Sequence, residues 1–201
     1  MRDPAKLLRS AVARSTRSFA AMSNESIKER EELIAEIVRA FDGVTLGYGI
    51  TLHEAIAIDD YKTQEERMAA RRLDKERQWQ DVSAAALLEC ESALSFLDES
   101  GFRYYLPAFM VKGLEDWDKK AGVPVDSCVH HLLHDYPHSL RESEPSTIAA
   151  KRGFNDAQCR AIAHFLRFVI GPDDEFPTED PTTRQAVAKW ERFVNERVPA
   201  T

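Results

Sequence analysis

Histidines form the densest group of residues with metal-ligand chemistry in this sequence. Four of the six histidines fall within the nine-residue segment HHLLHDYPH. His130 and His134 are four residues apart, so on a helix their rings share one face and are placed to hold a zinc ion or a similar metal. His138, one residue beyond Pro137, is the candidate third ligand. These residues define one functional hypothesis, a metal-dependent enzyme.

The alternative for the same segment is a polar, partly exposed helix that ends in a histidine. The HExxH motif of metalloproteases is absent, because His131 stands where its glutamate would be. Histidine clusters that lack a third ligand at a fixed spacing seldom bind metal tightly. We therefore expect no metal and no other cofactor, with His130, His134 and His138 as the candidates if a metal does bind.

A second group of titratable residues lies in the segment HEAIAIDDY, residues 53–61. His53 and the carboxylate pair Asp59 and Asp60 are of the types used in general acid–base catalysis. Glu54 has a structural explanation, because it stands where a capping box needs a glutamate. Acids at the end of a helix oppose the helix dipole and more often begin the next turn. The sequence therefore favours a structural role for these residues over catalysis.

The sequence contains no motif for nucleophilic catalysis or for phosphate binding, since GxSxG, GxxxxGK[ST] and GxGxxG are all absent. The three cysteines, Cys90, Cys128 and Cys159, are far apart and form no CxxC pair. Their number and spacing argue against a disulfide framework and a cysteine zinc site, and favour a reducing compartment such as the cytoplasm. Their apolar neighbours indicate that the thiols act as small buried hydrophobes.

Helix-start signals in the sequence predict which helices and loops hold the candidate residues. Residues 26–29, 51–54 and 63–66 each read as a capping box, and Asn155 to Gln158 cap a further amphipathic helix. Glycine-rich residues 43–49 are the most loop-like part of the front half, and residues 138–146 read as a surface loop. The helices expected from these signals span residues 26 to about 41, a short stretch from 52, 65–79, 83–97, 102–114, 126–136 with Asp126 as cap, 156–170 and 181 onward.

The segment GFRYYLPAFM, residues 101–110, is expected to be the central helix. Phe102, Tyr105, Leu106 and Phe109 lie on one helical face, and the opposite side is apolar too. Pro107 removes an N–H and clashes with the carbonyl of Arg103, so a kink or a break is expected there. Aromatic stripes at helical spacing are mostly core, so this segment is predicted to be structural core.

Composition gives the fold class and excludes several function classes. A chain of 201 residues with 43% hydrophobic residues and few strand signals predicts one all-α globular domain of about seven to nine helices. No stretch approaches the roughly 20 uncharged apolar residues of a membrane span. The net charge is −7, which argues against general nucleic-acid binding through a basic face.

The first 22 residues form a basic segment that differs from the acidic remainder. Three interpretations remain open: a short helix or arm, a targeting segment, or an upstream extension before a true start at Met22. Residues 23–201 are expected to form the helical domain.

The sequence from Leu94 to Leu114, which contains FRYYLPA, resembles an uncharacterised family of bacterial proteins. Residues 40–61 add to the resemblance, which covers roughly residues 30–118. The resemblance implies no catalytic residues. Small acidic bacterial proteins of this kind often occur near polymorphic toxins, so it implies an immunity role by analogy.

The function expected from these observations is protein binding in the cytoplasm, as an immunity protein that neutralises a basic toxin domain. Acidic side chains complement a basic partner and speed association. The alternatives are the metal-dependent enzyme and a helical scaffold without a separable site; the oligomeric state is left open. The expected partner-binding residues are Asp59, Asp60, Glu65, Glu66, Asp173, Asp174 and Glu175.

Overall fold

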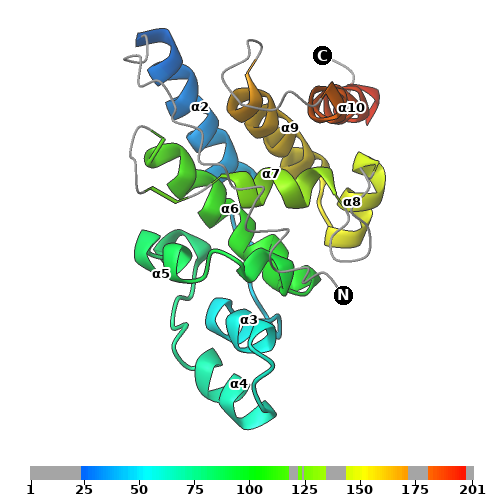
Figure 1. The fold of residues 1–201 in the computed structure, drawn as a ribbon. Helices are drawn as coiled ribbons and strands as arrows, with labels where there is room; N and C mark the ends of the chain where they lie inside the picture. The colour runs from blue at the N-terminus through cyan, green and yellow to red at the C-terminus, as the bar shows by residue number, and fades with distance from the viewer. Residues whose placement is uncertain (1–23, 118–121, 124, 135–143, 172–180, 198–201) are drawn as a thin grey trace.

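Helices make up the architecture, which we describe from a computed structural model. It describes residues 24–117, 122–123, 125–134, 144–171 and 181–197. These contain nine α-helices, two short 3-10 helices and no β-strand, which confirms the all-α prediction (Figure 1). The helices are α2 (Asn24–Ala40), α3 (Leu52–Asp59), α4 (Gln64–Arg71), η1 (Trp79–Asp81), α5 (Ala84–Glu89), η2 (Ala93–Ser95), α6 (Glu99–Glu115), α7 (Asp126–Leu133), α8 (Pro145–Arg152), α9 (Asp156–Ile170) and α10 (Pro181–Arg197).

Helix α6 lies at the centre, as its apolar circumference predicts. Phe102, Tyr105, Leu106, Pro107 and Phe109 are all buried. The helix contacts α2, α7, α8 and both 3-10 helices. It runs without interruption through Pro107, so the expected break is wrong, whereas the kink stays a prediction.

Arg103 is the one charged residue near the middle of α6, and it joins α6 to the end of α8. Its Nη1 donates to the carbonyl of Gly153 at 3.2 Å and lies 3.6 Å from Glu99 Oε1. Gly153 stands just beyond α8 with a φ of 66°, the left-handed conformation typical of a helix C-terminus. Arg103 therefore satisfies a carbonyl at the end of a neighbouring helix.

The glycine-rich loop before α3 docks onto the N-terminus of α6. Asp98 caps α6 by accepting from the N–H of Gly101 at 2.8 Å, and its same oxygen accepts from the N–H of Ile50 at 3.0 Å. The backbones approach so closely that a Cβ on Gly49 would lie 2.7 Å from Gly101 N. Glycine is therefore required on both sides of this contact.

Two buried tryptophans connect segments that are distant in sequence. Trp79 Nε1 donates to the carbonyl of Phe41 at 3.0 Å, and Trp190 Nε1 donates to the carbonyl of Leu132 at 2.9 Å. The first bond joins η1 to the end of α2, and the second joins α10 to α7. Buried indole N–H groups normally require such a partner, so both rings have a fixed orientation.

Helix α2 packs against α9 at the end of the molecule that also holds α10 (Figure 1). Glu36 on α2 faces His164 on α9, with 2.8 Å between Oε2 and Nδ1. This hydrogen bond holds the pKa of the Glu36 carboxyl below its usual value. The pair links two helices whose sequences lie far apart.

Several expected helix boundaries are wrong. Helix α2 begins at Asn24, so Ser26 lies inside its first turn and is not its cap. The N-cap of α7 is Val125, and Asp126 is the first helical residue. The single helix expected at 83–97 is two short ones, α5 and η2, separated by a turn at 90–92. The charged helix expected at 65–79 ends at Arg71.

Candidate functional site

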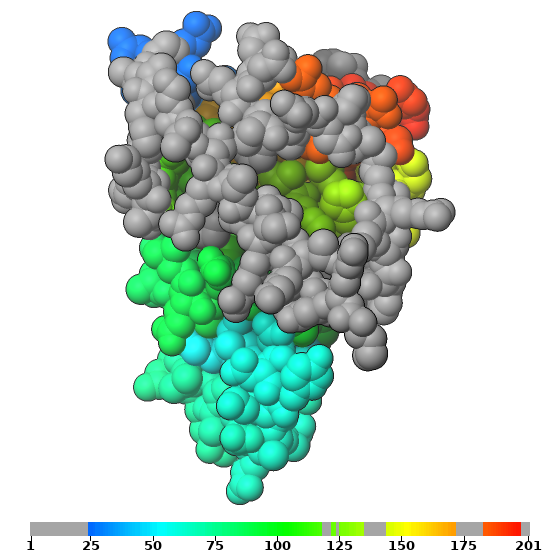
Figure 2. Space-filling view, in the orientation of Figure 1, coloured from blue at the N-terminus to red at the C-terminus, as the bar shows by residue number. Residues whose placement is uncertain are grey.

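Helices α3 and α4 form one end of the molecule, on the opposite side of α6 from α9 and α10 (Figures 1 and 2). Helix α4 has its main contacts with α3 and buries no side chain. Polar groups hold it instead: Glu54, only 6% exposed, accepts from Arg71 at 2.7 Å and lies 3.6 Å from Arg67. Arg71 also donates to the carbonyl of Gly49 at 2.8 Å. The charge pairing at Glu54 therefore fixes α4 to α3, and Arg71 also links α4 to the loop that precedes α3.

Capping interactions define the start of both helices. Thr63 and Glu66 form the predicted capping box, with the Thr63 N–H 2.9 Å from Glu66 Oε2 and the Glu66 N–H 3.3 Å from Thr63 Oγ1. At α3 the box is weaker. The Thr51 N–H donates to Glu54 at 3.5 Å, and the Thr51 hydroxyl has no hydrogen-bond partner among the described residues. Glu54 therefore serves mainly as the partner of Arg71.

The turn between α3 and α4 carries an unusual residue. Lys62 N–H donates to the carbonyl of Ala57 at 2.9 Å, and Tyr61 N–H donates to the carbonyl of Ile58 at 3.0 Å. These two bonds make a Schellman motif, which places Tyr61 at the left-handed position. Its φ is 56°, and among the described residues it is the only non-glycine with a positive φ.

Helix α8 ends in the same motif, with the residue type that the geometry favours. Phe154 N–H bonds Ala149 at 2.9 Å, Gly153 N–H bonds Ala150 at 3.3 Å, and glycine takes the left-handed position. A side chain in this conformation costs about 1–2 kcal/mol. At Tyr61 no burial of the side chain offsets this cost, because the residue is 96% exposed. Packing therefore gives no reason for an aromatic residue at this left-handed position.

Two of the expected partner-binding acids are available at this turn, and two have internal partners. Asp59 accepts from the Ser92 hydroxyl at 3.2 Å, and Glu66 is occupied in its capping box. Asp60 and Glu65 are exposed, and their side chains form no hydrogen bond or ion pair within the described part of the chain. Residues 173–175, which hold the other expected acids, lie outside the described residues.

We define the turn surface as Asp60, Tyr61, Glu65 and Met68, all of which are exposed. Glu65 and Met68 are three residues apart and share a face of α4. Met68 is 41% exposed. Residues 59–66 contain four acids and one lysine, so the charge at this turn is negative. The exposed groups at the turn and along the start of α4 are therefore an aromatic ring, a thioether and the carboxylates of Asp60 and Glu65.

Tyr61→Gly is expected to stabilise the isolated protein. Glycine adopts a positive φ without steric cost, and the exposed ring makes no packing contact that would be lost. We expect the free energy of unfolding to rise by about 1 kcal/mol, measured by denaturant titration. A Tyr61→Gly variant that is less stable than wild type would contradict the strain assigned to this residue.

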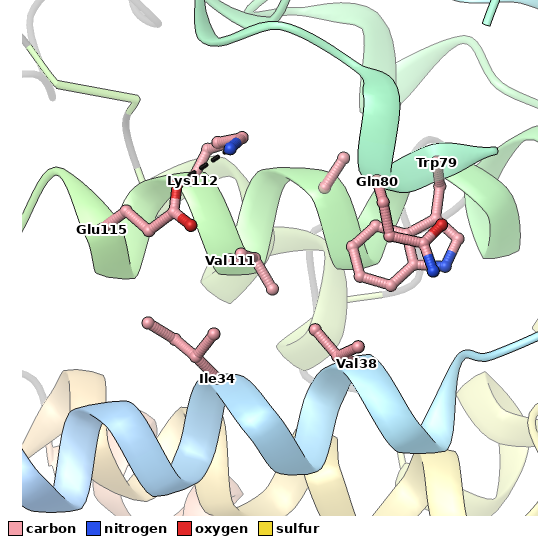
Figure 3. A pocket seen from close by; sticks show the side chains of 8 residues that line it. Ile34, Val38, Trp79, Gln80, Val111, Lys112 and Glu115 are labelled. Carbon is pink, nitrogen blue, oxygen red and sulfur yellow. Dashed lines mark hydrogen bonds and ion pairs between the residues drawn. The ribbon is translucent and has the colours of Figure 1, made fainter.

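A shallow apolar groove lies elsewhere on the surface (Figure 3). Its volume is about 160 Å³, close to the roughly 150 Å³ of a cavity that holds a benzene ring. Its one charged pair, Lys112 and Glu115, is closed by a 2.9 Å contact, so the groove offers no free group for catalysis. It is lined by Ile34, Val38, Trp79, Gln80, Ala108, Val111, Lys112 and Glu115.

The histidines of α7 are arranged only in part as expected. The rings of His130 and His134 do lie on one face, with centroids 5.0 Å apart. Burial, and then the charge of His134, lowers the pKa of His130. His138 lies outside the described residues, and in the part of the chain that is described no three or more histidines, cysteines or acids form a group able to hold a metal.

His131, on the other side of α7, belongs to the core. It is 3% exposed, and its Nε2 lies 3.2 Å from the Ser95 hydroxyl. Burial is the main cause that lowers its pKa to about 3, so it stays neutral at physiological pH. Cys90, Cys128 and Cys159 are also buried thiols, as predicted. None of the described helices has the length and apolarity that crossing a membrane requires.

The sequence prediction named the acids of the turn but did not single out Tyr61. A signal was present: Tyr61 follows the end of a predicted short helix, at the point where glycine is common. The sequence also suggested His53 with Asp59 and Asp60, whereas the structure pairs His53 with Asp74. The residues of the turn surface are thus close in the sequence, whereas His53 and Asp74 are far apart in it.

Comparison with known proteins identifies the family. Searches of curated proteins and of solved structures found no match. A scan of protein families matches residues 29–193 to the family of unknown function DUF6714. The match runs from α2 to α10 and includes the histidines of α7, so it extends beyond the region that carries the FRYYLPA resemblance. Because it spans more than half of the chain, the protein belongs to the DUF6714 family.

Proposed function

We propose that this protein acts by binding another protein through the turn surface. The observation that carries the proposal is Tyr61, an aromatic side chain held fully exposed at a position where glycine would be more stable. Tyrosine supplies a large contact area at low cost in side-chain entropy and is enriched among the residues that dominate binding energy. The ring is presented by a turn whose backbone is fixed on both sides by helix ends.

The specific role we propose is that of a cytoplasmic bacterial immunity protein that neutralises a toxin domain by direct contact. Asp60 precedes Tyr61 and Glu65 follows it by four residues, and neither carboxylate has a hydrogen-bond or ion-pair partner among the described residues, so both are available to a basic surface. Such complementarity raises the association rate and disfavours acidic partners. A Tyr61-centred contact with acidic neighbours therefore suits a basic protein partner.

The test is co-expression with the product of the adjacent gene, followed by co-purification and a growth assay. Wild type is expected to form a complex and to restore growth. Tyr61→Gly is expected to weaken the complex at least about 30-fold, the effect of losing a residue that contributes 2 kcal/mol to binding. The double variant Asp60→Lys and Glu65→Lys is expected to slow association.

Tyr61→Gly separates recognition from folding, because it is expected to stabilise the free protein while weakening the complex. Tyr48→Ala is the matched control, since Tyr48 is equally exposed but lies before the start of α3. A complex that survives Tyr61→Gly unchanged would exclude the turn surface as the contact. The absence of both complex and growth rescue would exclude the immunity role and leave a helical scaffold as the simpler description.

A further inference from the structure

Three exposed cations lie in the loop of residues 72–78, which connects α4 to η1. Arg72, Lys75 and Arg77 are exposed, and their side chains form no hydrogen bond or ion pair within the described part of the chain. Leu73 lies among them in the sequence and is 61% exposed. We define the cationic loop as these four residues, which present positive charge on a chain whose net charge is −7.

The cations are unpaired because α4 ends before them. If the helix continued as the sequence predicted, Arg72 would lie one turn from Glu76. Arg77 would likewise lie one turn from Asp74. The helix ends at Arg71 and the residues that follow are irregular, so neither ion pair forms among the described residues. The positive charges are therefore left to solvent.

Inward-facing groups anchor the loop that presents these cations. One oxygen of Asp74 lies 2.6 Å from Nδ1 of His53, and the other accepts from the His53 backbone N–H at 3.0 Å. The Asp74 side chain is only 3% exposed. The carbonyl of Glu76 accepts from the Tyr104 hydroxyl at 3.4 Å. A backbone that is already fixed loses less conformational freedom on binding, so this loop is suited to recognition.

The cationic loop and the acids of the turn surface lie at opposite ends of α4. Asp60 and Glu65 lie at its N-terminal end, and the loop follows its C-terminal end. The eight residues of this helix span about 12 Å. That length exceeds the screening length of about 8 Å at physiological ionic strength. A partner therefore meets two separate charged patches along one helix, one negative and one positive.

Nucleic acids and anionic lipid bilayers complement only one of these patches. Both extend their negative charge well beyond about 12 Å, the length of α4, so they would place like charges against Asp60 and Glu65. A protein surface can present a basic and an acidic region side by side. A standard protein interface buries about 800 Å² on each partner, which is wide enough to cover both ends of α4. The charge pattern therefore favours a protein.

We propose that the cationic loop binds an acidic region of the same protein partner whose basic region contacts the turn surface. This inference rests on the proposed function and adds the charge order of the partner, basic opposite Tyr61 and acidic opposite Arg72. Opposite charges at the two ends of α4 fix the direction in which the partner lies, since the reversed orientation would oppose like charges at both ends. Leu73 adds an exposed apolar side chain to this contact.

The test is the rate of association with the product of the adjacent gene, measured for wild type and for a loop variant that combines Arg72→Gln, Lys75→Gln and Arg77→Gln. The loop variant is expected to associate about tenfold more slowly at low salt, at the lower end of the range for electrostatic steering. The difference is expected to shrink at about 1 M salt, where the screening length falls to about 3 Å. Because the three side chains have no partner among the described residues, the variant is expected to unfold at the wild-type temperature.

The matched control is a second triple variant that combines Arg39→Gln, Arg167→Gln and Arg192→Gln, on α2, α9 and α10. These side chains are also exposed, so the same amount of charge is removed from another part of the surface. The control is expected to associate at close to the wild-type rate. Equal slowing of both variants would assign the effect to net charge and overturn this inference.

The remaining outcomes separate the cationic loop from the turn surface. A complex that forms equally fast with wild type and with the loop variant would overturn this inference and leave the turn surface as the contact. No complex with wild type would overturn the proposed function, and this inference with it. Binding of wild type to duplex DNA or to phosphatidylserine vesicles at physiological salt, lost in the loop variant, would overturn the assignment to a protein partner.

Discussion

Phe102→Ala is expected to lower the free energy of unfolding by about 4 kcal/mol, within the range for large aromatic residues cut back to alanine in a core. The ring is fully buried. The Arg152 guanidinium stacks over the ring, with its Cζ 4.0 Å from the ring centroid. The ring also contacts the rings of Phe154 and His131. Arg152 is itself only 7% exposed, so losing this aromatic face removes a favourable contact from a charge held away from water.

Urea unfolding followed by circular dichroism measures this effect. Phe102→Leu is the matched comparison, because it keeps much of the apolar volume but removes the aromatic face above Arg152. It is expected to be less destabilising than Phe102→Ala. Leu88→Ala, at a residue 40% exposed, is the control for loss of an apolar side chain at the surface. Equal effects of Phe102→Ala and Leu88→Ala would contradict the central position assigned to α6.

Gly101→Ala is expected to destabilise the protein by about 3 kcal/mol, at the upper end of the usual range for overpacking. Alanine normally favours a helix over glycine. Here the added Cβ would collide with the carbonyl oxygen of Ile50 and lie 3.0 Å from Oδ1 of Asp98. Since the obstructing carbonyl is backbone, the loop that docks on α6 must move, and the shared bonds to Asp98 would be lost with it.

Gly113→Ala provides the comparison for Gly101→Ala. Its Cβ would lie 2.5 Å from Cγ1 of Val125, a side-chain atom. Val125→Ala removes that atom, so the double variant is expected to recover part of the stability lost in Gly113→Ala. No single side-chain truncation removes the Ile50 carbonyl. Equal stability of Gly101→Ala and wild type in thermal unfolding would contradict the close approach of the two backbones.

Local sequence patterns predicted the features that depend on adjacent residues. The capping box at Thr63 and Glu66 forms as expected, and so does the one at Asn155 and Gln158, with bonds of 2.9 and 3.1 Å. The apolar circumference of residues 102–114 correctly indicated the central helix. These signals work because both partners lie within one helical turn, where spacing alone brings them together.

Features that depend on tertiary contacts were not predictable in the same way. Residues 83–97 have the composition of a continuous apolar helix, yet they break after Glu89, and Ser92 bonds Asp59 across the fold. No helix was predicted at α8, and its first two residues were placed in the surface loop 138–146, although Pro145 at the first position of a helix is a known start signal. Asp74 and His53 are 21 residues apart, and no local pattern joins them.

Helix α4 is attached by polar contacts and stands apart from the apolar core. It buries no side chain, and its attachment depends mainly on Arg67 and Arg71 contacting Glu54. Substitutions at its other positions, apart from Glu66 of the capping box, are therefore expected to change stability by no more than about 0.5 kcal/mol. If the turn surface binds a partner as proposed, its residues can be substituted while α6 and its neighbours keep their packing arrangement, because α4 contributes no buried side chain.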